Sequence, residues 1–234
     1  MKNSIIVLIL LSLVGLASCN KDMPKEIVLE YGTVTDIDGN SYQTVKINDQ
    51  WWMCQNLKTT RFNDGTAIPF FAINDTMGWA SGPGYKTIAD SLYGQLYNYT
   101  TVLDQRGLAP EGWHIATDED WKKLERSIGM DSSETELMAW RGKDEVNGVL
   151  PQNSNNWPLS SVHFGNNKYA LSINPGGVVL YNGSISSNSL EAYFWTSTHD
   201  AQQAIYRSIS YQRTQIFRQY ADMRYGMSVR CVKN

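Results

Sequence analysis

Short segments of alternating polarity, separated by turn residues, run through this 234-residue chain and leave little room for helix. Apolar and polar residues that alternate with a period of two are typical of strands with one buried face. A stretch rich in Asn, Gly and Ser from 147 to 157 predicts an irregular loop. The chain should therefore form a mostly antiparallel β domain, whose expected later strands are 168–173, 178–181, 193–198, 204–211, 215–220 and 228–233.

The clearest turn signal is Asp-Gly-Asn at 38–40, which lies between the apolar-rich segment 34–37 and the alternating segment 42–47. Asp-Gly pairs suit the tight turn of a β-hairpin, so a hairpin is expected here. Together with Asp36, the same residues also match the start of a calcium-binding loop. Apolar residues stand where the later carboxylate ligands would be needed, so we expect no metal site.

Two short helices are expected in the middle of the chain. Thr117 precedes three acidic residues, a pattern similar to a capping box, and acidic residues there complement the helix dipole. Trp121, Leu124 and Ile128 then fall on one face and predict a core stripe. A second helix is expected at 133–140. The sequence thus predicts an α+β fold, a single domain of mostly antiparallel β structure with two short helices and long loops.

The N-terminal segment is expected to direct export. Its apolar run at 5–13 is too short to cross a bilayer, which takes about 20 residues. Leu-Ala-Ser before Cys19 resembles the lipobox of bacterial lipoproteins, in which the cysteine is acylated and becomes the first mature residue. The alternative is an ordinary secretory signal with a chance cysteine. The expected organisation is a signal peptide at 1–18, lipidation at Cys19, a polar tether at 19–28 and one domain at 29–234.

The residues after Cys19 favour a location at the outer membrane. Asn20 stands where the best-known inner-membrane retention signal has Asp. Lys21 and Asp22 resemble, imperfectly, the charged surface-export signal of Bacteroidetes lipoproteins. We therefore expect an outer-membrane lipoprotein, held by its lipid and exposed at the cell surface.

The charge balance argues against a nucleic acid partner. The chain carries 20 Lys plus Arg against 23 Asp plus Glu, for a formal charge of −3. This leaves no basic excess with which to neutralise phosphates.

Cys54 and Cys231 are the two cysteines that remain beside the lipidated one. They lie far apart in the sequence and lack the close spacing of metal ligands. In an oxidising compartment they could form a disulfide, and the alternative is a pair of buried thiols that behave as small hydrophobic residues.

Six segments, in this order, resemble the blocks of the Fibrobacter succinogenes major paralogous domain: 51–57 (WWMCQNL), 93–98 (YGQLYN), 109–121 (APEGWHIATDEDW), 174–177 (NPGG), 194–198 (FWTST) and 228–232 (SVRCV). Cys54 stands where the family more often has a small residue, and Trp51 doubles an aromatic that is usually single. Members are typically exported or lipid-anchored proteins of Fibrobacter and Bacteroidetes. The family has no established enzymatic activity, so the resemblance implies a non-catalytic protein.

The order of the expected elements also resembles a C-type-lectin-like fold, in which terminal strands pair, two helices flank the sheet and a long loop region follows. That resemblance concerns the fold and implies no function by itself. The calcium- and sugar-binding motifs of true C-type lectins are absent from the sequence. Calcium-dependent sugar binding is therefore not implied.

The residues give no support to an enzyme. His114, His163 and His199 lack the spacing of a metal site, and no nucleophile elbow or phosphate-binding loop occurs. The acidic residues at 118–120 are explained by helix capping rather than by paired catalytic carboxylates. We expect no catalytic residue, no cofactor and no metal.

Aromatic side chains in loops are the candidate ligand contacts, because an aromatic face can stack on a sugar ring while nearby amides donate hydrogen bonds. A chain with 8 Trp must also bury several of them, so each candidate could instead be a packing residue. The arginines from 207 to 230 are expected on the polar face and turns of strands, or alternatively around an anionic ligand. The candidate contacts are Trp79, Tyr85, Asn155, Asn156, Trp157, Tyr181 and Asn182.

Two functions from different classes remain open. The first is a non-catalytic, surface-exposed binding or adhesion module, with a glycan or a cell-surface protein as its candidate ligand. The second is a structural or accessory subunit of a cell-surface assembly. A binding module should carry a concave aromatic and polar site, whereas a subunit should expose a flat apolar patch or an unpaired strand edge.

Overall fold

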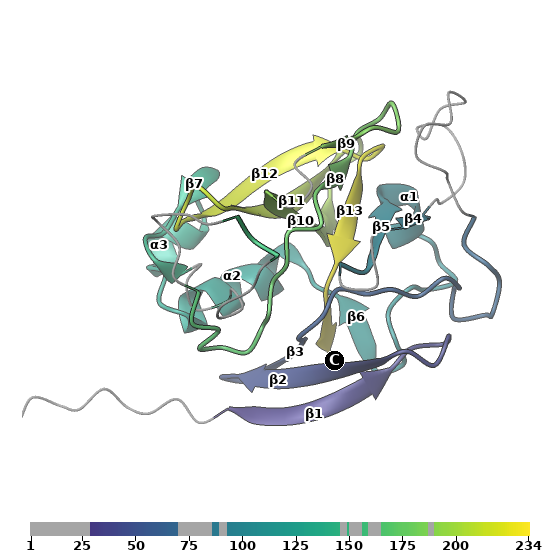
Figure 1. The fold of residues 1–234 in the computed structure, drawn as a ribbon, viewed down its shortest axis with the longest axis horizontal. Coiled ribbons are helices and arrows are strands. Elements are labelled where there is room, and N and C mark those ends of the chain that lie inside the picture. The colour runs from purple at the N-terminus through teal and green to yellow at the C-terminus, as the bar shows by residue number, and fades with distance from the viewer. Residues whose placement is uncertain are drawn as a thin grey trace, which may run out of the picture.

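The computed structural model describes residues 29–69, 86–88, 93–145, 149, 156–158, 165–186 and 190–234. These residues form two sheets, and the five-stranded sheet with β1 and β2 lies at the bottom of Figure 1 while the larger sheet lies above it. Across the described part of the chain, no helix has the length and apolar character needed to cross a membrane.

The five-stranded sheet brings together strands from the two ends of the domain. Its strands, in spatial order, are β1 (Glu30–Thr35), β2 (Ser41–Ile47), β3 (Gln50–Met53), β14 (Cys231–Lys233) and β6 (Trp113–Ile115). The expected hairpin is confirmed, since β1 pairs antiparallel with β2. Asp36 Oδ1 accepts hydrogen bonds from the backbone N–H groups of Asp38 and Asn40, so this carboxylate shapes the turn.

The second sheet contains most of the later strands. Among the described strands, β10 pairs parallel with β13 and the other strand pairs are antiparallel, while an isolated parallel bridge joins Gly177 to Ala192. Four expected strands correspond to β8, β10, β11 and β12, and the expected strand at 228–233 is divided at Arg230 between two sheets. Its strands, in spatial order, are β4 (Lys86–Ile88), β5 (Gln95–Asn98), β13 (Gly226–Val229), β10 (Glu191–His199), β11 (Gln203–Ser210), β12 (Ile216–Asp222) and β7 (Ala139–Arg141), with β8 (Val178–Val179) and β9 (Ile185–Ser186) attached beside β13.

The expected strand at 168–173 was wrong. Asn167, Ala170 and Ser172 all have positive φ angles, which a regular strand does not tolerate. Asn167 instead holds the segment as a loop, because its Oδ1 accepts from Ser172 N and its Nδ2 donates to Ser172 Oγ.

Three short helices lie among the described residues: α1 (Tyr99–Val102), α2 (Asp118–Ser127) and α3 (Ser132–Thr135). The capping box of α2 is confirmed, with Thr117 Oγ1 accepting from Asp120 N at 3.0 Å and Asp120 Oδ2 accepting from Thr117 N at 2.9 Å. The second helix was predicted too long. It ends at Thr135, and residues 139–141 pair with β12 as β7.

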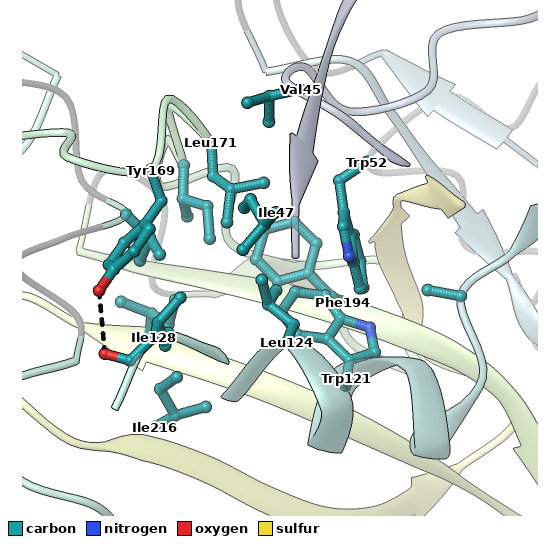
Figure 2. Close-up of a cluster of buried hydrophobic side chains, with 14 of the residues drawn as sticks. Val45, Ile47, Trp52, Trp121, Leu124, Ile128, Tyr169, Leu171, Phe194 and Ile216 are labelled. Atoms are coloured by element: carbon teal, nitrogen blue, oxygen red, sulfur yellow. Dashed lines mark hydrogen bonds between the residues drawn. The ribbon is translucent and has the colours of Figure 1, made fainter. Parts of the chain in front are cut away.

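The first core cluster joins both sheets through α2. Trp52 of β3, Trp121 of α2 and Phe194 of β10 lie together in this cluster (Figure 2). The ring centroids of Trp52 and Trp121 are 5.2 Å apart, and those of Trp121 and Phe194 are 5.4 Å apart. Leu124 and Ile128 are also buried, so the expected core stripe of α2 is confirmed. A second core cluster of buried side chains surrounds Tyr97, Tyr99, Trp195 and Met227. The fold is therefore mostly β, with short helices packed on the sheets.

Cys54 and Cys231 are free, buried thiols, so the disulfide considered from the sequence is not formed. The register explains why. Val232 lies opposite Trp52, and successive side chains of a strand point to opposite faces. Cys54 accordingly packs in the first core cluster with Trp52, and Cys231 packs in the second with Met53.

Candidate binding face

The inner face of the second sheet carries a buried ion-pair network. Arg207 of β11 donates to Glu125 and Asp118 of α2, with both N–O distances at 2.7 Å. Arg218 of β12 pairs with Asp118 at 2.7 Å, and Arg141 of β7 pairs with Glu125 at 2.6 Å. Burial alone would raise the pKa of Asp118, but Arg218 and Arg207 hold it well below its ordinary value. The network ties α2 to three strands.

Arg230 occupies the point where the chain passes from β13 to β14, and thus from one sheet to the other. It is 2% exposed, and its Nη1 donates to the carbonyl oxygens of Met53 and Leu171 at 2.9 and 2.7 Å. Its Nε donates to Asn56 Oδ1 at 2.8 Å, and Asn56 Nδ2 donates to Tyr93 O at 2.8 Å. Burial lowers the pKa of Arg230 to about 10.

The arginines between residues 207 and 230 were expected on the polar face and in the turns of strands, and for three of them this expectation was wrong. Arg207, Arg218 and Arg230 are buried. Only carboxylates or carbonyl oxygens can satisfy such a buried cation, and the two carboxylates come from α2. Asp118 therefore does more than cap the helix. Arg224 does lie in a turn, where it pairs with Asp222.

The outer face of the same strands is different. Phe194, Arg207 and Arg218 share the inner face by register, so the side chains next to them in sequence point outward. Four of those outward side chains are partly exposed aromatics, one on each of four adjacent strands at the upper left of Figure 1. We call this set the aromatic row: Tyr193 on β10, Tyr206 on β11, Phe217 on β12 and Trp140 on β7.

Each ring of the aromatic row contacts the ring on the next strand of the sheet. The centroids of Tyr193 and Tyr206 are 5.9 Å apart with an interplanar angle of 28°. Tyr206 and Phe217 are 6.0 Å apart, and Phe217 and Trp140 are 4.9 Å apart. Beyond Tyr206 the outer face is closed, since Trp195 is fully buried in the second core cluster. The row therefore lies where the cover of the sheet ends.

Polar groups accompany the aromatic row. Glu191 accepts a hydrogen bond from the hydroxyl of Tyr193 at one end, and the Arg213 guanidinium lies 5.6 Å from the Trp140 ring at the other. Burial, with Glu191 and Tyr225 nearby, raises the pKa of Tyr206 to about 12, so its hydroxyl stays protonated at neutral pH. Aromatic faces, hydroxyls and opposite charges thus share one surface.

The six sequence blocks explain the interior rather than this surface. Beyond the Arg230 contacts, Ala116 N donates to Arg230 O at 2.9 Å and Ser197 N donates to Ala116 O at 3.0 Å. Gly94 has a φ of +78°, and a Cβ there would lie 2.7 Å from Leu57 O, so the position requires glycine. The blocks therefore meet around one buried junction.

The sequence model of the Fibrobacter succinogenes major domain matches residues 45–233. The chain belongs to this family. The matched range begins within β2 and ends in β14, so it takes in nearly all of both sheets. No curated protein and no solved structure matches the chain.

In this Fibrobacter succinogenes major domain, the ligand contacts expected from the sequence lie in different places and do not form one site. Trp157 is partly buried against the first core cluster, and its Nε1 donates to Ile173 O at 2.9 Å. It is thus a packing residue, the alternative considered for it. Asn156 Nδ2 donates to Asn174 Oδ1 at 3.0 Å.

Tyr181 and Asn182 lie in the turn between β8 and β9, apart from Trp157. Tyr181 is 52% exposed and stacks on Tyr225 with centroids 6.5 Å apart. Asn182 Oδ1 accepts from the N–H and hydroxyl of Ser184, which occupies it in the turn. The remaining predicted sites lie outside the described residues: Cys19, Trp79, Tyr85 and Asn155.

Two hollows lie along β1, and their described lining residues include none of the expected contacts. One, of about 470 Å³, is lined by Tyr31, Gly32, Thr33 and Gln43. The other, of about 430 Å³, is lined by Thr35, Asp36, Ile37, Asn63, Pro110 and Glu111. Among the described residues, no group of three or more His, Cys, Asp or Glu side chains could hold a metal.

Sequence reasoning missed the aromatic row, although a signal for it existed. Tyr206 precedes Arg207, and Phe217 precedes Arg218, so one residue type in each pair must face inward. Asp118 and Glu125 lie seven residues apart, on the same side of a helix as Trp121. Two carboxylates on the buried side of the helix require cationic partners. The arginines must therefore be on the strand face that packs against the helix, and the aromatic residues next to them must be on the opposite face.

Proposed function

We propose that this protein is a non-catalytic, surface-exposed binding module that holds a glycan on the aromatic row. The observation that supports this function best is the continuity of Tyr193, Tyr206, Phe217 and Trp140 across four strands, each ring partly exposed and in contact with the next. Aromatic faces bind the apolar faces of sugar rings, and polar groups at their edges orient the hydroxyls.

The shape of the row favours an extended chain over a single sugar. Neighbouring strands lie about 4.8 Å apart, so one aromatic ring per strand gives a repeat similar in length to one pyranose unit. A sheet surface is also rigid, because its side chains stand on hydrogen-bonded strands. The ligand in this proposal is therefore a polysaccharide that crosses β10, β11, β12 and β7.

The flanks of the row distinguish a glycan site from a protein-docking patch. Ser208 lies between Tyr193 and Phe217 in register, but it is only 4% exposed, so its hydroxyl is not available to a ligand. Gln219 lies beside Tyr206 and is half-buried. These polar side chains make the apolar strip narrow, whereas a docking surface for a protein usually presents a broad apolar patch. The Gln219 amide beside the rings suits the hydroxylated edge of a sugar.

The proposal includes the location and the finer fold expected from the sequence. Lipidation at Cys19 would attach the domain to the outer membrane, and the tether at 19–28 would let it face outward from the cell. A C-type-lectin-like fold is supported by the placement of β1 and β14 in one sheet and by the flanking helix α2.

The test is a glycan and polysaccharide binding screen with the purified full-length chain in mild detergent. Phe217→Ala and Trp140→Ala should each weaken binding about tenfold, because each removes one stacking face. Tyr31→Ala is the matched control, since Tyr31 is a 63% exposed aromatic on β1, in the other sheet. Thermal unfolding of each variant checks that the domain remains folded.

The outcome that contradicts the proposal is specific. If both variants fold and bind every glycan as the wild type does, the aromatic row is not the site. If the full chain retains no glycan at all, the function is wrong.

A second candidate function is a structural or accessory subunit of a cell-surface assembly. It is favoured by two features. β1 is an edge strand on which Tyr31 is exposed, and Leu137, close to β7 in the sequence, is 56% exposed. Unpaired edges and exposed apolar side chains are typical of docking surfaces. Cross-linking on intact cells followed by mass spectrometry would detect a stoichiometric partner, and the absence of one would eliminate this candidate.

A further inference from the structure

Two arginines lie over exposed aromatic rings of the second sheet, and their charges are balanced differently. Arg224 lies 5.4 Å from the Tyr181 ring and forms an ion pair with Asp222. Arg213 lies 5.6 Å from the Trp140 ring, and within the described part of the chain its guanidinium has no carboxylate partner. Among the described residues, no carboxylate therefore pairs with the positive charge at the Trp140 end of the aromatic row.

The position of Arg213 is fixed by the turn between β11 and β12. Its backbone N–H donates to Ser210 O at 3.1 Å, and its side chain is exposed. A guanidinium that stacks on an indole still presents its N–H groups at the edge, in a planar fork that matches a carboxylate or a sulfate. The exposed N–H groups of Arg213 are thus available to a ligand.

The opposite end of the row has the opposite charge, because Glu191 lies beside Tyr193 and Tyr206. A ligand on the row consequently meets a positive end at Trp140 and a negative end at Tyr193. The chain as a whole is negative, at −3, so long-range attraction does not favour an anion. A local contact, such as one at Arg213, is therefore needed to select an anion.

We infer that Arg213 and Trp140 form a subsite for the acidic group of an anionic polysaccharide, either a uronic acid carboxylate or a sugar sulfate. This inference rests on the proposed function and adds the chemical class of the ligand to it. Trp140 supplies the stacking face, and Arg213 supplies paired hydrogen bonds to the anion. Glu191 disfavours an acidic group at the Tyr193 end, so the polysaccharide binds along the row in one direction.

The experiment compares two matched pairs of probes on the full-length chain in mild detergent: oligogalacturonate with its methyl ester, and dextran sulfate with dextran. The wild type should bind one acidic probe about tenfold more tightly than its neutral counterpart. Preference for oligogalacturonate identifies a carboxylate subsite, and preference for dextran sulfate identifies a sulfate subsite.

Arg213→Gln should abolish that preference while it leaves binding of the neutral probe within about twofold. Arg224→Gln is the matched control. It also removes a guanidinium that lies over an aromatic ring, but Asp222 already balances the charge of that guanidinium. Arg213→Lys should retain part of the preference, since it keeps the charge and loses the fork. The preference of the wild type should also fall as salt concentration rises.

Several outcomes would overturn the inference. Equal binding of acidic and neutral probes by the wild type excludes an anion subsite, and a preference that survives in Arg213→Gln places it elsewhere. Polyglutamate that competes as well as the acidic glycan would indicate an acidic protein partner instead. Failure of the inference leaves neutral glycan binding sensitive to Phe217→Ala, whereas failure of the proposed function removes all glycan binding.

Discussion

The two faces of β11 and β12 differ sharply, although the residues that form them alternate along the same strands. On the inner face, Arg207 and Arg218 are buried and bound to carboxylates of α2. On the outer face, Tyr206 and Phe217 are partly exposed and contact each other through their rings. The inner face holds the domain together, and the outer face is left with groups that can meet a ligand. Substitutions on the two faces of one pair of strands should therefore differ in their effect on stability.

The largest effect is expected on the inner face. Arg207→Met should lower the free energy of unfolding by about 3–5 kcal/mol, because it leaves the buried Glu125 and Asp118 short of a cation. Tyr206→Ala, one residue away, should cost about 1–2 kcal/mol because its ring is only partly buried. Urea unfolding of both variants measures the contrast. Equal costs would mean that the outer face is as much a part of the core as the inner face.

Glu119→Gln controls for the loss of charge as such. Glu119 pairs with Arg126 on the exposed side of α2, where its side chain is 66% exposed. Its removal should change the free energy of unfolding by less than about 0.5 kcal/mol.

Acid should have the next largest effect, through two carboxylates in the first turn of α2. Burial raises the pKa of Asp120, but hydrogen bonds from His114 and Thr117 outweigh it and lower the pKa to about 2. A carboxyl whose folded pKa lies below its unfolded value, near 3.9, contributes stability that is present above that value and is lost as pH falls through the folded pKa. The free energy of unfolding should therefore decrease from about pH 4 to pH 2, with Asp118 acting in the same direction.

Asp120→Asn should cost about 1–2 kcal/mol at pH 7 and should flatten the decline between pH 4 and pH 2. Urea unfolding at a series of pH values gives the comparison, with Glu111→Gln, an exposed carboxyl outside α2, as the control. A variant profile parallel to that of the wild type would show that Asp120 contributes no charge-dependent stability.

The smallest effect is expected from the two thiols, which extend the comparison to the faces of the five-stranded sheet. Cys54 and Cys231 pack on opposite faces, so a reductant should change the free energy of unfolding by less than about 0.5 kcal/mol. Removal of a disulfide would typically cost about 2–5 kcal/mol. Thiol labelling of the unreduced, denatured chain should modify both cysteines. A chain that resists labelling until it is reduced would contain the bridge after all.

Local patterns predicted the parts of the fold that depend on neighbours in sequence. The hairpin of β1 and β2, the capping box of α2 and the later strands follow from turn chemistry and periodicity. The second helix was overextended because Leu137 and Trp140, three residues apart, have the spacing of a helical face. Pairing of residues 139–141 with β12 ends that helix, and a local pattern contains no record of such a distant partner.

The candidate site was harder to predict than the fold. Whether Tyr206 or Arg207 faces inward depends on carboxylates more than eighty residues earlier, on α2. Trp157 has a sequence context similar to that of an exposed loop aromatic, yet a hydrogen bond to Ile173 O and the first core cluster decide its role. Site residues of this kind depend on tertiary contacts that spacing alone does not encode.

The position of β14 has a consequence for how the chain acquires its structure. β14 lies between β3 and β6, and Arg230 beside it contacts Asn56, 174 positions earlier. The five-stranded sheet is therefore incomplete until the last residues of the domain are available, and pairings at such long sequence separation form slowly. During synthesis, the N-terminal strands would therefore stay loosely structured until the C-terminal strands had been made.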